Sequence, residues 1–418
     1  MRRSTTLAAA AMAVLAAGTM IALAETGSAA PAVQPAAVAT NWYGAAPYVM
    51  PLDNNPPDLS QVMAATGQKT FELAFVLADG GCNAAWGGTA DVSADTTVAN
   101  LINGVRSAGG DVSVSFGGYG GTKLGQVCGS AAATAAAEQA VISKYSLKAV
   151  DFDLEEPEYE NTTDINYEIG AAQILQQNNP GLYVSITTAG TTSGTGYFGQ
   201  NVLNTAKGMG FTPNNFSIMP FDGGFNGAAS QTSALDQFHT LLMNTFGWTS
   251  ANAFAHEGFS GMNGRSDSGE YFYQADFQTV LNYALSNGLS RFTFWAVNRD
   301  RQCSPPDNNG TTSGTCSSVT QNSWDFTKYT AQFGGATPPN SPPPTTTTTA
   351  PPTTTTTTSG GGGSSSGQCA GVAAWSSEST YNGGATATYD GHLWTAKWWT
   401  YNDVPGGPAG VWTDNGAC

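Results

Sequence analysis

Three carboxylates alternate with apolar residues in the stretch LKAVDFDLEEPEYE, residues 147–160. Asp151, Asp153 and Glu155 share one face if this stretch is a strand, because successive side chains of a strand point to opposite sides. Carboxyl groups crowded on one face cannot all ionise cheaply, so at least one pKa should rise and the row should titrate as a coupled set. A raised carboxyl pKa is what a general acid needs near neutral pH. The row therefore predicts acid/base catalysis.

Apolar residues on the other face of this stretch favour a buried strand. Phe152 and Leu154 are suited to packing against helices, whereas a solvated acidic edge strand and a calcium site are the alternative interpretations. Glu156 and Glu158 follow the row, and we expect both to be solvated.

The elements around the row alternate between strand and helix patterns over about 300 residues, a length usual for a single barrel domain. This alternation predicts an α/β fold, a (β/α)8 TIM barrel with the acids inside and rising toward its C-terminal mouth. A doubly wound sheet is the alternative, although its dinucleotide glycine fingerprint is missing. The expected strands are 39–49, 71–77, 111–118, 149–155, 182–188, 216–222, 252–258 and 291–297, and the clearest helices are 130–146, 165–179 and 273–287.

Composition limits the partners. The chain has 418 residues and a formal net charge of -16 at pH 7, and phosphate-rich partners need Lys and Arg. We therefore expect neither nucleic acid nor a membrane as a partner. We also expect a monomer. The glycine-rich stretch 117–125 lacks the ending of a phosphate-binding loop, and no Cys/His metal spacing appears, so we expect no cofactor and no metal.

The first residues are typical of a secretion signal, with Arg2 and Arg3 before an apolar run and cleavage after Ala24 or Ala30. A membrane anchor is the weaker alternative, because the run is rich in alanine. Six cysteines, an even number, fit an oxidising, extracellular compartment. Their positions suggest local pairs, although the sequence alone allows 15 connectivities. The suggested pairs are Cys82–Cys128, Cys303–Cys316 and Cys369–Cys418.

A sharp change of composition divides the chain near Gly335. The expected regions are a signal (1–30), a catalytic domain (38–334), a Pro/Thr and Gly/Ser linker (335–367) and a small all-β module (368–418).

Four stretches in order resemble the family 18 glycoside hydrolases. VDFDLE (150–155) is similar to the acidic signature at the end of barrel strand four, and VSVSFGG (112–118) to strand three. FSIMPFD (216–222) is similar to strand six and FTFWAVNRD (292–300) to strand eight. APYV (46–49), FVLADGGC (75–82) and NRDRQC (298–303) further resemble secreted bacterial chitinases of that family.

The resemblance implies a retaining mechanism in which the substrate's own acetamido oxygen is the nucleophile. Glu155 is then the acid and base, and Asp153 holds the acetamide and stabilises the oxazolinium ion. Asp151 shares a proton with Asp153, and Ser115 hydrogen-bonds into that network. Trp295 forms the floor under the sugar, for which an amphipathic ring is suited; core packing is the alternative for this side chain.

The stretch around strand six departs from the family pattern. Phe221 stands where many members have a tyrosine that binds the acetamide carbonyl, and Gly223 stands where other relatives have one. Asp222 is kept, and Asp222 and Met219 are the candidates there for contact with substrate. Either Tyr43 or another tyrosine supplies the missing hydroxyl, or the activity is weak or altered in specificity.

The C-terminal region is rich in aromatic residues and resembles the chitin-binding modules of carbohydrate-binding families 5 and 12, through YDGHLWTAKWWTYNDVPG (389–406). An exposed aromatic strip for a polysaccharide is favoured over an aromatic mini-core. The candidate binding residues are Tyr381, Trp394, Trp398 and Trp399; in a strand the last two face opposite sides.

Together these features predict a secreted, endo-acting chitinase that hydrolyses β-1,4 links between N-acetylglucosamine units, with chitin and chitooligosaccharides as partners. One alternative is an endo-β-N-acetylglucosaminidase acting on glycoprotein glycans. The other is a catalytically weak chitin-binding protein.

Overall fold

The computed structural model describes residues 40–335 continuously and, near the C-terminus, residues 369, 372–376, 380–381, 385–397, 400–401, 404–407 and 411–418. The expected secretion signal, residues 336–367 of the expected linker, Trp398 and Trp399 lie outside the described residues.

Residues 40–335 form a closed ring of parallel strands, as predicted. The strands pair in the order β1, β2, β5, β6, β7, β9, β10 and β13, and every pair is parallel. The side chain of Thr293 donates to the Ala46 carbonyl, which joins the last strand to the first. The barrel strands are β1 (Tyr48–Val49), β2 (Thr70–Ala78), β5 (Asp111–Gly117), β6 (Ala149–Leu154), β7 (Tyr183–Thr191), β9 (Asn215–Met219), β10 (Glu257–Met262) and β13 (Arg291–Trp295).

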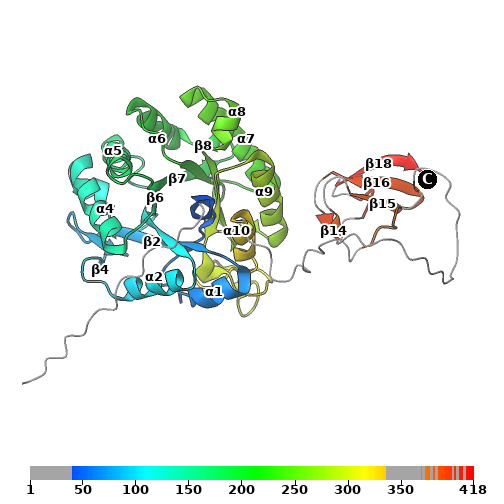
Figure 1. The fold of residues 1–418 in the computed structure, drawn as a ribbon, viewed down its shortest axis with the longest axis horizontal. Coiled ribbons are helices and arrows are strands. Elements are labelled where there is room, and N and C mark those ends of the chain that lie inside the picture. The colour runs from blue at the N-terminus through cyan, green and yellow to red at the C-terminus, as the bar shows by residue number, and fades with distance from the viewer. Residues whose placement is uncertain are drawn as a thin grey trace, which may run out of the picture.

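Helices follow the strands and surround them in chain order (Figure 1). They are α1 (Leu59–Thr66), α2 (Thr97–Ser107), α3 (Leu124–Val127), α4 (Ala131–Tyr145), α5 (Thr162–Asn178), α6 (Tyr197–Gly208), α7 (Gly227–Phe246), α8 (Ser250–Phe254), α9 (Gln274–Asn287) and α10 (Thr327–Phe333), with 3-10 helices η1 (Thr40–Ala45), η2 (Val297–Arg299) and η3 (Asn308–Gly310). Short strands also occur outside the ring: β3 (Ala84–Trp86), β4 (Ala90–Asp91), β8 (Gly194–Thr195), β11 (Gly264–Arg265) and β12 (Tyr271–Phe272).

Most predicted elements are confirmed, including the three helices, which are α4, α5 and α9. The prediction of a strand over 252–258 is wrong at its start. Thr249 caps α8 by accepting a hydrogen bond from the Asn252 backbone N–H at 3.3 Å, so residues 250–254 are helical. The barrel strand begins only at Glu257. The expected first strand is also shorter, because residues 40–45 form η1.

The core lies between the outer face of the barrel and the helices. In β6 the residues Val150, Phe152 and Leu154 are buried in this core. The alternate residues of the strand face the inside of the barrel, as the sequence pattern predicts.

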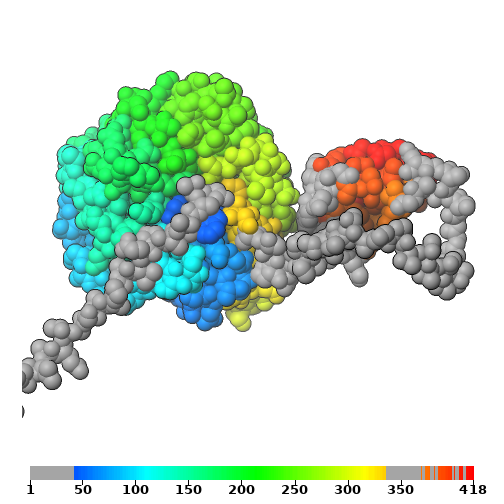
Figure 2. Space-filling view, in the orientation of Figure 1, coloured from blue at the N-terminus to red at the C-terminus, as the bar shows by residue number. Residues whose placement is uncertain are grey.

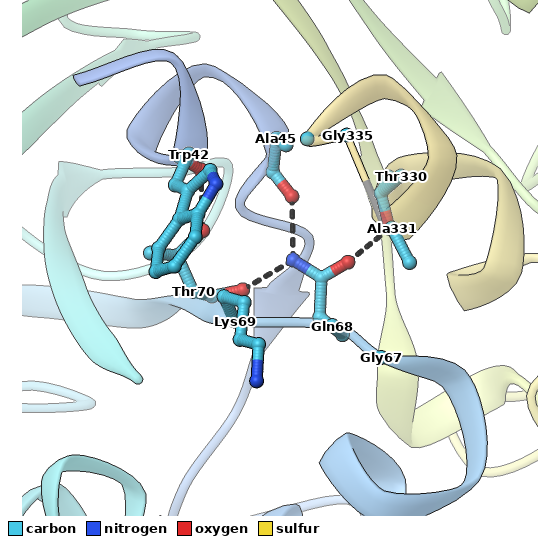
Figure 3. Close-up of a pocket in the computed structure, with 10 residues that line it drawn as sticks. Trp42, Ala45, Gly67, Gln68, Lys69, Thr70, Thr330, Ala331 and Gly335 are labelled. Atoms are coloured by element: carbon cyan, nitrogen blue, oxygen red, sulfur yellow. Dashed lines mark hydrogen bonds between the residues drawn. The ribbon is translucent and has the colours of Figure 1, made fainter. Parts of the chain in front are cut away.

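The N-terminal end of the barrel is closed by η1 and α10, whose blue and gold residues meet on the face shown in Figure 2. The buried Gln68 amide donates to the carbonyls of Ala45 and Thr70 and accepts a hydrogen bond from Thr330 (Figure 3). A pocket of about 130 Å³ lies beside it. These contacts join the first and the last residues of the barrel segment. They lie at the N-terminal face of the barrel, opposite its C-terminal mouth.

The described C-terminal residues form small antiparallel sheets, with strands β14 (Thr380–Tyr381), β15 (Thr386–Tyr389), β16 (His392–Ala396), β17 (Thr400–Tyr401) and β18 (Trp412–Ala417). All three predicted disulfides are present: Cys82–Cys128, Cys303–Cys316 and Cys369–Cys418. Within the described residues, no helix has the length and apolar character needed to cross a bilayer.

Candidate active site

The acidic row points into the barrel and rises to its C-terminal mouth. Asp151 and Asp153 are buried on the inner face of β6, and Glu155 follows the end of that strand and is partly exposed. Asp151 pairs in register with Ser115 and Ser185 of the two neighbouring strands. The solvated edge strand considered from the sequence is therefore excluded.

Four hydroxyl groups surround the Asp151 carboxylate. It accepts hydrogen bonds from Tyr48 at 2.9 Å, Ser115 at 2.8 Å, Ser185 at 2.5 Å and Thr187 at 2.8 Å. Ser115 lies where the resemblance places it. The resemblance implied that Asp151 and Asp153 share a proton. Within the described residues, no hydrogen bond joins these two carboxyl groups. Asp151 is instead held as an acceptor by its hydroxyl neighbours.

A buried ionic network lies beside these hydroxyls. Arg291 forms an ion pair with Glu72, and its guanidinium lies 3.6 Å from a carboxylate oxygen of Asp151. Arg291 also donates to the hydroxyls of Ser185 at 2.8 Å and Tyr48 at 3.3 Å. Burial raises the pKa of Glu72 to about 8, although the charge of Arg291 opposes the shift. The lower part of the site is thus a tightly bonded polar core.

Asp153 lies above this network and is buried. Its Oδ1 atom is buried and has no hydrogen-bond partner among the described residues. Burial, followed by the negative charges of Glu155, Asp151 and Glu72, raises the pKa of Asp153 well above its usual range, while Arg291 acts in the opposite direction. A polar atom left in this state is suited to contact with a bound molecule.

Glu155 has the acidity that a proton donor needs near neutral pH. Burial and the charge of Glu156 raise its pKa to about 7, and Asp222 and Asp267 act in the same direction. The Lys123 ammonium group opposes them. Such a carboxyl group can give a proton to a leaving group and later take one from water.

The loop that carries Glu155 rests on buried carboxyl groups, which corrects the expectation for Glu158. Glu156 is partly exposed, but Glu158 is fully buried beside Glu138 of α4 and Glu168 of α5. Burial and the charge of Glu168 raise the pKa of Glu158 well above its usual range. Glu168 also accepts a hydrogen bond from the Gly125 backbone N–H at 2.6 Å. Packing against α4 and α5 therefore buries Glu158, a side chain that the sequence alone places in a solvated loop.

Two glycines allow β5 to approach the acidic strand. Gly117 has φ +108°, and a Cβ atom there would lie 2.1 Å from the Asp153 carbonyl oxygen. Gly118 has φ +85°, and a Cβ atom there would meet the ring of Phe75 at 2.6 Å. The Gly118 N–H donates to the Asp153 carbonyl at 2.8 Å. The glycine pair therefore sets the position of the Asp153 backbone.

An aromatic wall borders the mouth of the barrel. The partly exposed Trp295 ring stacks on Phe75, with ring centroids 5.4 Å apart and an interplanar angle of 7°. The Tyr48 ring lies 6.0 Å from Trp295. Met219, at the end of β9, is buried in register with Ala189. Trp295 thus combines packing on one side with exposure suited to a sugar ring.

Asp222 is exposed in the loop after β9, and its Oδ1 atom accepts a hydrogen bond from the Ser268 N–H at 2.6 Å. Its charge reaches Glu155. Phe221 packs against the core as a partly buried side chain.

Tyr43 is not part of this site, which corrects its expected role in binding substrate. Its hydroxyl donates to Asp111 at 2.7 Å, and its ring packs on Ala149 and Tyr183. These three residues begin their strands, so Tyr43 lies at the N-terminal end of the barrel. Tyr48, a tyrosine of the same first segment, is the one that reaches the acidic row.

Sequence reasoning missed several members of the network: Tyr48, Glu72, Ser185, Thr187 and Arg291. Most of them lie in the same kind of polar and apolar alternation that identified the acidic row. Glu72 and Ser185 each lie between two apolar residues, and Arg291 begins the run RFTFW, in which polar and apolar residues alternate. Applied to every strand, the same pattern would have placed them inside the barrel.

The candidate binding residues of the C-terminal module are only partly described. Tyr381 and Trp394 are partly buried and pack against its small core, and the Tyr381 ring meets Trp412 at 4.9 Å. Both therefore contribute to packing while part of each side chain reaches solvent. Trp398 and Trp399 lie outside the described residues, so it stays a prediction that one of them is buried and the other exposed.

Comparisons with known proteins match two separate parts of the chain. Residues 374–413 match the family model of carbohydrate-binding module family 5/12. The barrel is similar to the crystal structure of the catalytic domain of a hyperthermophilic chitinase from Pyrococcus furiosus, with a TM-score of 0.62 and 23% identity over 69% of this chain and 93% of that one. This likeness confirms the fold.

Two curated relatives are also similar in sequence. The chain is 28% identical over 276 residues to a probable bifunctional chitinase/lysozyme of Escherichia coli (strain K12), covering 61% of this chain and 30% of the relative. It is 26% identical over 281 residues to endochitinase 11 of Metarhizium anisopliae, covering 61% of this chain and 52% of the relative. The match thus spans about a third of one relative's length and about half of the other's. The predicted resemblance to chitinases is confirmed.

Proposed function

We propose that this protein is a secreted chitinase that hydrolyses β-1,4 links between N-acetylglucosamine units with retention of configuration. The observation that carries the proposal is the inward row of Asp151, Asp153 and Glu155 at the mouth of the barrel, with the pKa of Glu155 raised to about 7. The similarity to chitinases supports the choice of substrate. The disulfides support an extracellular location.

Glu155 and Asp153 would divide the chemistry between them. Glu155 donates its proton to the glycosidic oxygen, whose bond to the anomeric carbon breaks, while the acetamido oxygen of the same sugar bonds to that carbon. Asp153 stabilises the resulting oxazolinium cation. Glu155, now a carboxylate, takes a proton from water, and the water oxygen bonds to the anomeric carbon and releases the acetamido oxygen. The product keeps its β configuration, and no protein nucleophile is needed.

The other site residues would hold these groups and the sugar. Asp151 is fixed by its four hydroxyl neighbours, and its negative charge helps to raise the pKa of Asp153. The exposed face of Trp295 would support the reacting sugar, and Met219 would border it. Asp222 would contact the acetamide group. The C-terminal module would bind insoluble chitin and raise the local substrate concentration for the barrel.

The test is a timed digestion of soluble chitin hexamer, with products and their anomers resolved at early times. We expect dimers and trimers that are initially β-anomers. Early α-anomers would contradict the retaining mechanism. An uncleaved hexamer together with cleavage of a glycoprotein glycan would replace the proposal by an endo-β-N-acetylglucosaminidase, and adsorption to chitin with no hydrolysis by a chitin-binding protein.

The pH dependence of this reaction should follow Glu155. Its protonated form is needed first, so kcat/KM on chitin hexamer should fall about tenfold per pH unit above the pKa of about 7. Asp267→Asn should move this fall to lower pH, because the negative charge of Asp267 helps to raise the pKa of Glu155. The exposed Glu160 gives the matched control, Glu160→Gln. A profile that stays flat far above neutral pH would remove Glu155 as the acid.

A further inference from the structure

One carboxylate outside the acidic row accepts several hydrogen bonds from the backbone of a neighbouring loop. Glu270, in the loop between β11 and β12, accepts from three backbone N–H groups of the loop after β9, each at 2.7 Å. Asp222 donates to one oxygen, while Gly224 and Phe225 donate to the other. A carboxylate bonded to several backbone donors is a strong local restraint.

The loop after β9 is shaped to receive that carboxylate. Asp222 has φ +56° and Gly224 has φ +86°, so two residues of this short loop are in the left-handed region. Backbone of this kind turns successive N–H groups toward one side and forms a concave site for an anion. For Asp222 the conformation is unfavourable and has to be held by its surroundings.

The loop that carries Glu270 also restrains Asp222 directly. The Ser268 N–H donates to the Asp222 carboxylate at 2.6 Å, so each of the two loops supplies a carboxylate to the other's backbone. The start of this hairpin is itself anchored, because the buried Arg299 donates to the carbonyls of Asn263, just before β11, at 2.8 Å, and of Arg265 in β11. The restraint on Asp222 therefore extends through Glu270 and β11 to Arg299.

We propose that Glu270 is a positioning residue of the active site, which holds the loop after β9 in the conformation that presents Asp222 to Glu155 and to the substrate. The inference rests on the proposed function for its catalytic consequence. Glu270 itself touches no reacting atom. Its carboxylate faces backbone N–H groups, and its effect passes through Asp222.

A double-mutant cycle on chitin hexamer separates this role from a general structural one. Glu270→Ala and Asp222→Ala should each lower kcat/KM at least tenfold. The double variant should be no slower than Asp222→Ala alone, because Glu270 then has nothing left to position. Glu270→Gln should fall between the parent and Glu270→Ala, since its amide oxygen can still accept from Gly224 and Phe225, whereas its NH2 group cannot accept from Asp222. Glu160→Gln, at an exposed carboxylate of another loop, is the matched control and should keep the parent rate.

Hydrogen exchange provides a readout that does not depend on hydrolysis. In Glu270→Ala the amides of Asp222, Gly224 and Phe225 should exchange at least tenfold faster, while those of β6 keep the parent rates. Unchanged exchange, or additive losses in the cycle, would overturn the positioning role. A parent protein that leaves the hexamer intact would instead overturn the proposed function and with it the catalytic part of this inference, while exchange would still decide whether Glu270 orders the loop.

Discussion

Glu155→Gln is expected to lower kcat on chitin hexamer about a thousandfold, which is the loss typical when a general acid and base is removed. Glutamine keeps the size of the side chain but has no proton to give at the pKa of about 7 that the site creates for Glu155. Asp153 cannot take over this step, because it lies buried deeper on the inner face of β6. The measurement is the initial rate of hexamer cleavage at a pH below 7.

Adsorption to chitin powder and the thermal unfolding midpoint should match the parent in this variant. Glu160→Gln is again the control, because it removes an exposed carboxylate five residues further along the chain. A rate within tenfold of the parent would exclude Glu155 from the proposed role.

Arg291→Met should cause the largest loss of stability, about 3–5 kcal/mol in the free energy of unfolding, as is typical when one partner of a buried ion pair is removed. The guanidinium is buried between Glu72 and Asp151 and also bonds to two hydroxyls. Methionine fills a similar volume but leaves both carboxyl groups in the interior without their cation. Chemical denaturation at neutral pH measures the difference.

Two further variants show whether charge is the cause. Lys207→Met removes an exposed cation from α6 and should change the free energy of unfolding by less than about 0.5 kcal/mol. Adding Glu72→Gln to Arg291→Met should restore part of the loss, since it removes one of the two buried carboxyl groups that have lost their cation. A loss below about 1 kcal/mol in Arg291→Met would mean that the network contributes no such stabilisation.

Much of the barrel was predictable because its strands obey a simple alternation. The run with Asp151 and Asp153 shows apolar residues toward the helices and polar residues toward the interior, and the structure has this arrangement. The boundary near Glu257 was not predictable in this way. The strand EGFSGM contains two glycines and no β-branched residue, so its pattern is weak. The preceding NAF segment is apolar enough to resemble a strand.

The site was predictable where chemistry depends on residue type along one strand, and not where it depends on contacts between distant segments. The row ending at Glu155 was visible in a few letters. The choice of Tyr48 over Tyr43 was not, because both lie in one short segment whose turn decides which ring reaches the acids. The hydrogen bond from the Asp222 backbone to Glu270 joins two loops at a separation of 48 residues. No sequence pattern within either loop predicts this contact.

Tyr48 links the first barrel strand to the fourth and the last. Its hydroxyl bonds to Asp151, 103 residues away, and to Arg291, 243 residues away. Contacts so distant in sequence form late, because a long stretch of chain must lose its freedom before they can stabilise anything. The strand that carries the acidic row can therefore pair with its immediate neighbours β5 and β7 before Tyr48 and Arg291 complete its surroundings. The proposed activity therefore requires the closed ring. A barrel that lacks its first or its last strand would carry the carboxylates without the residues that set their pKa values.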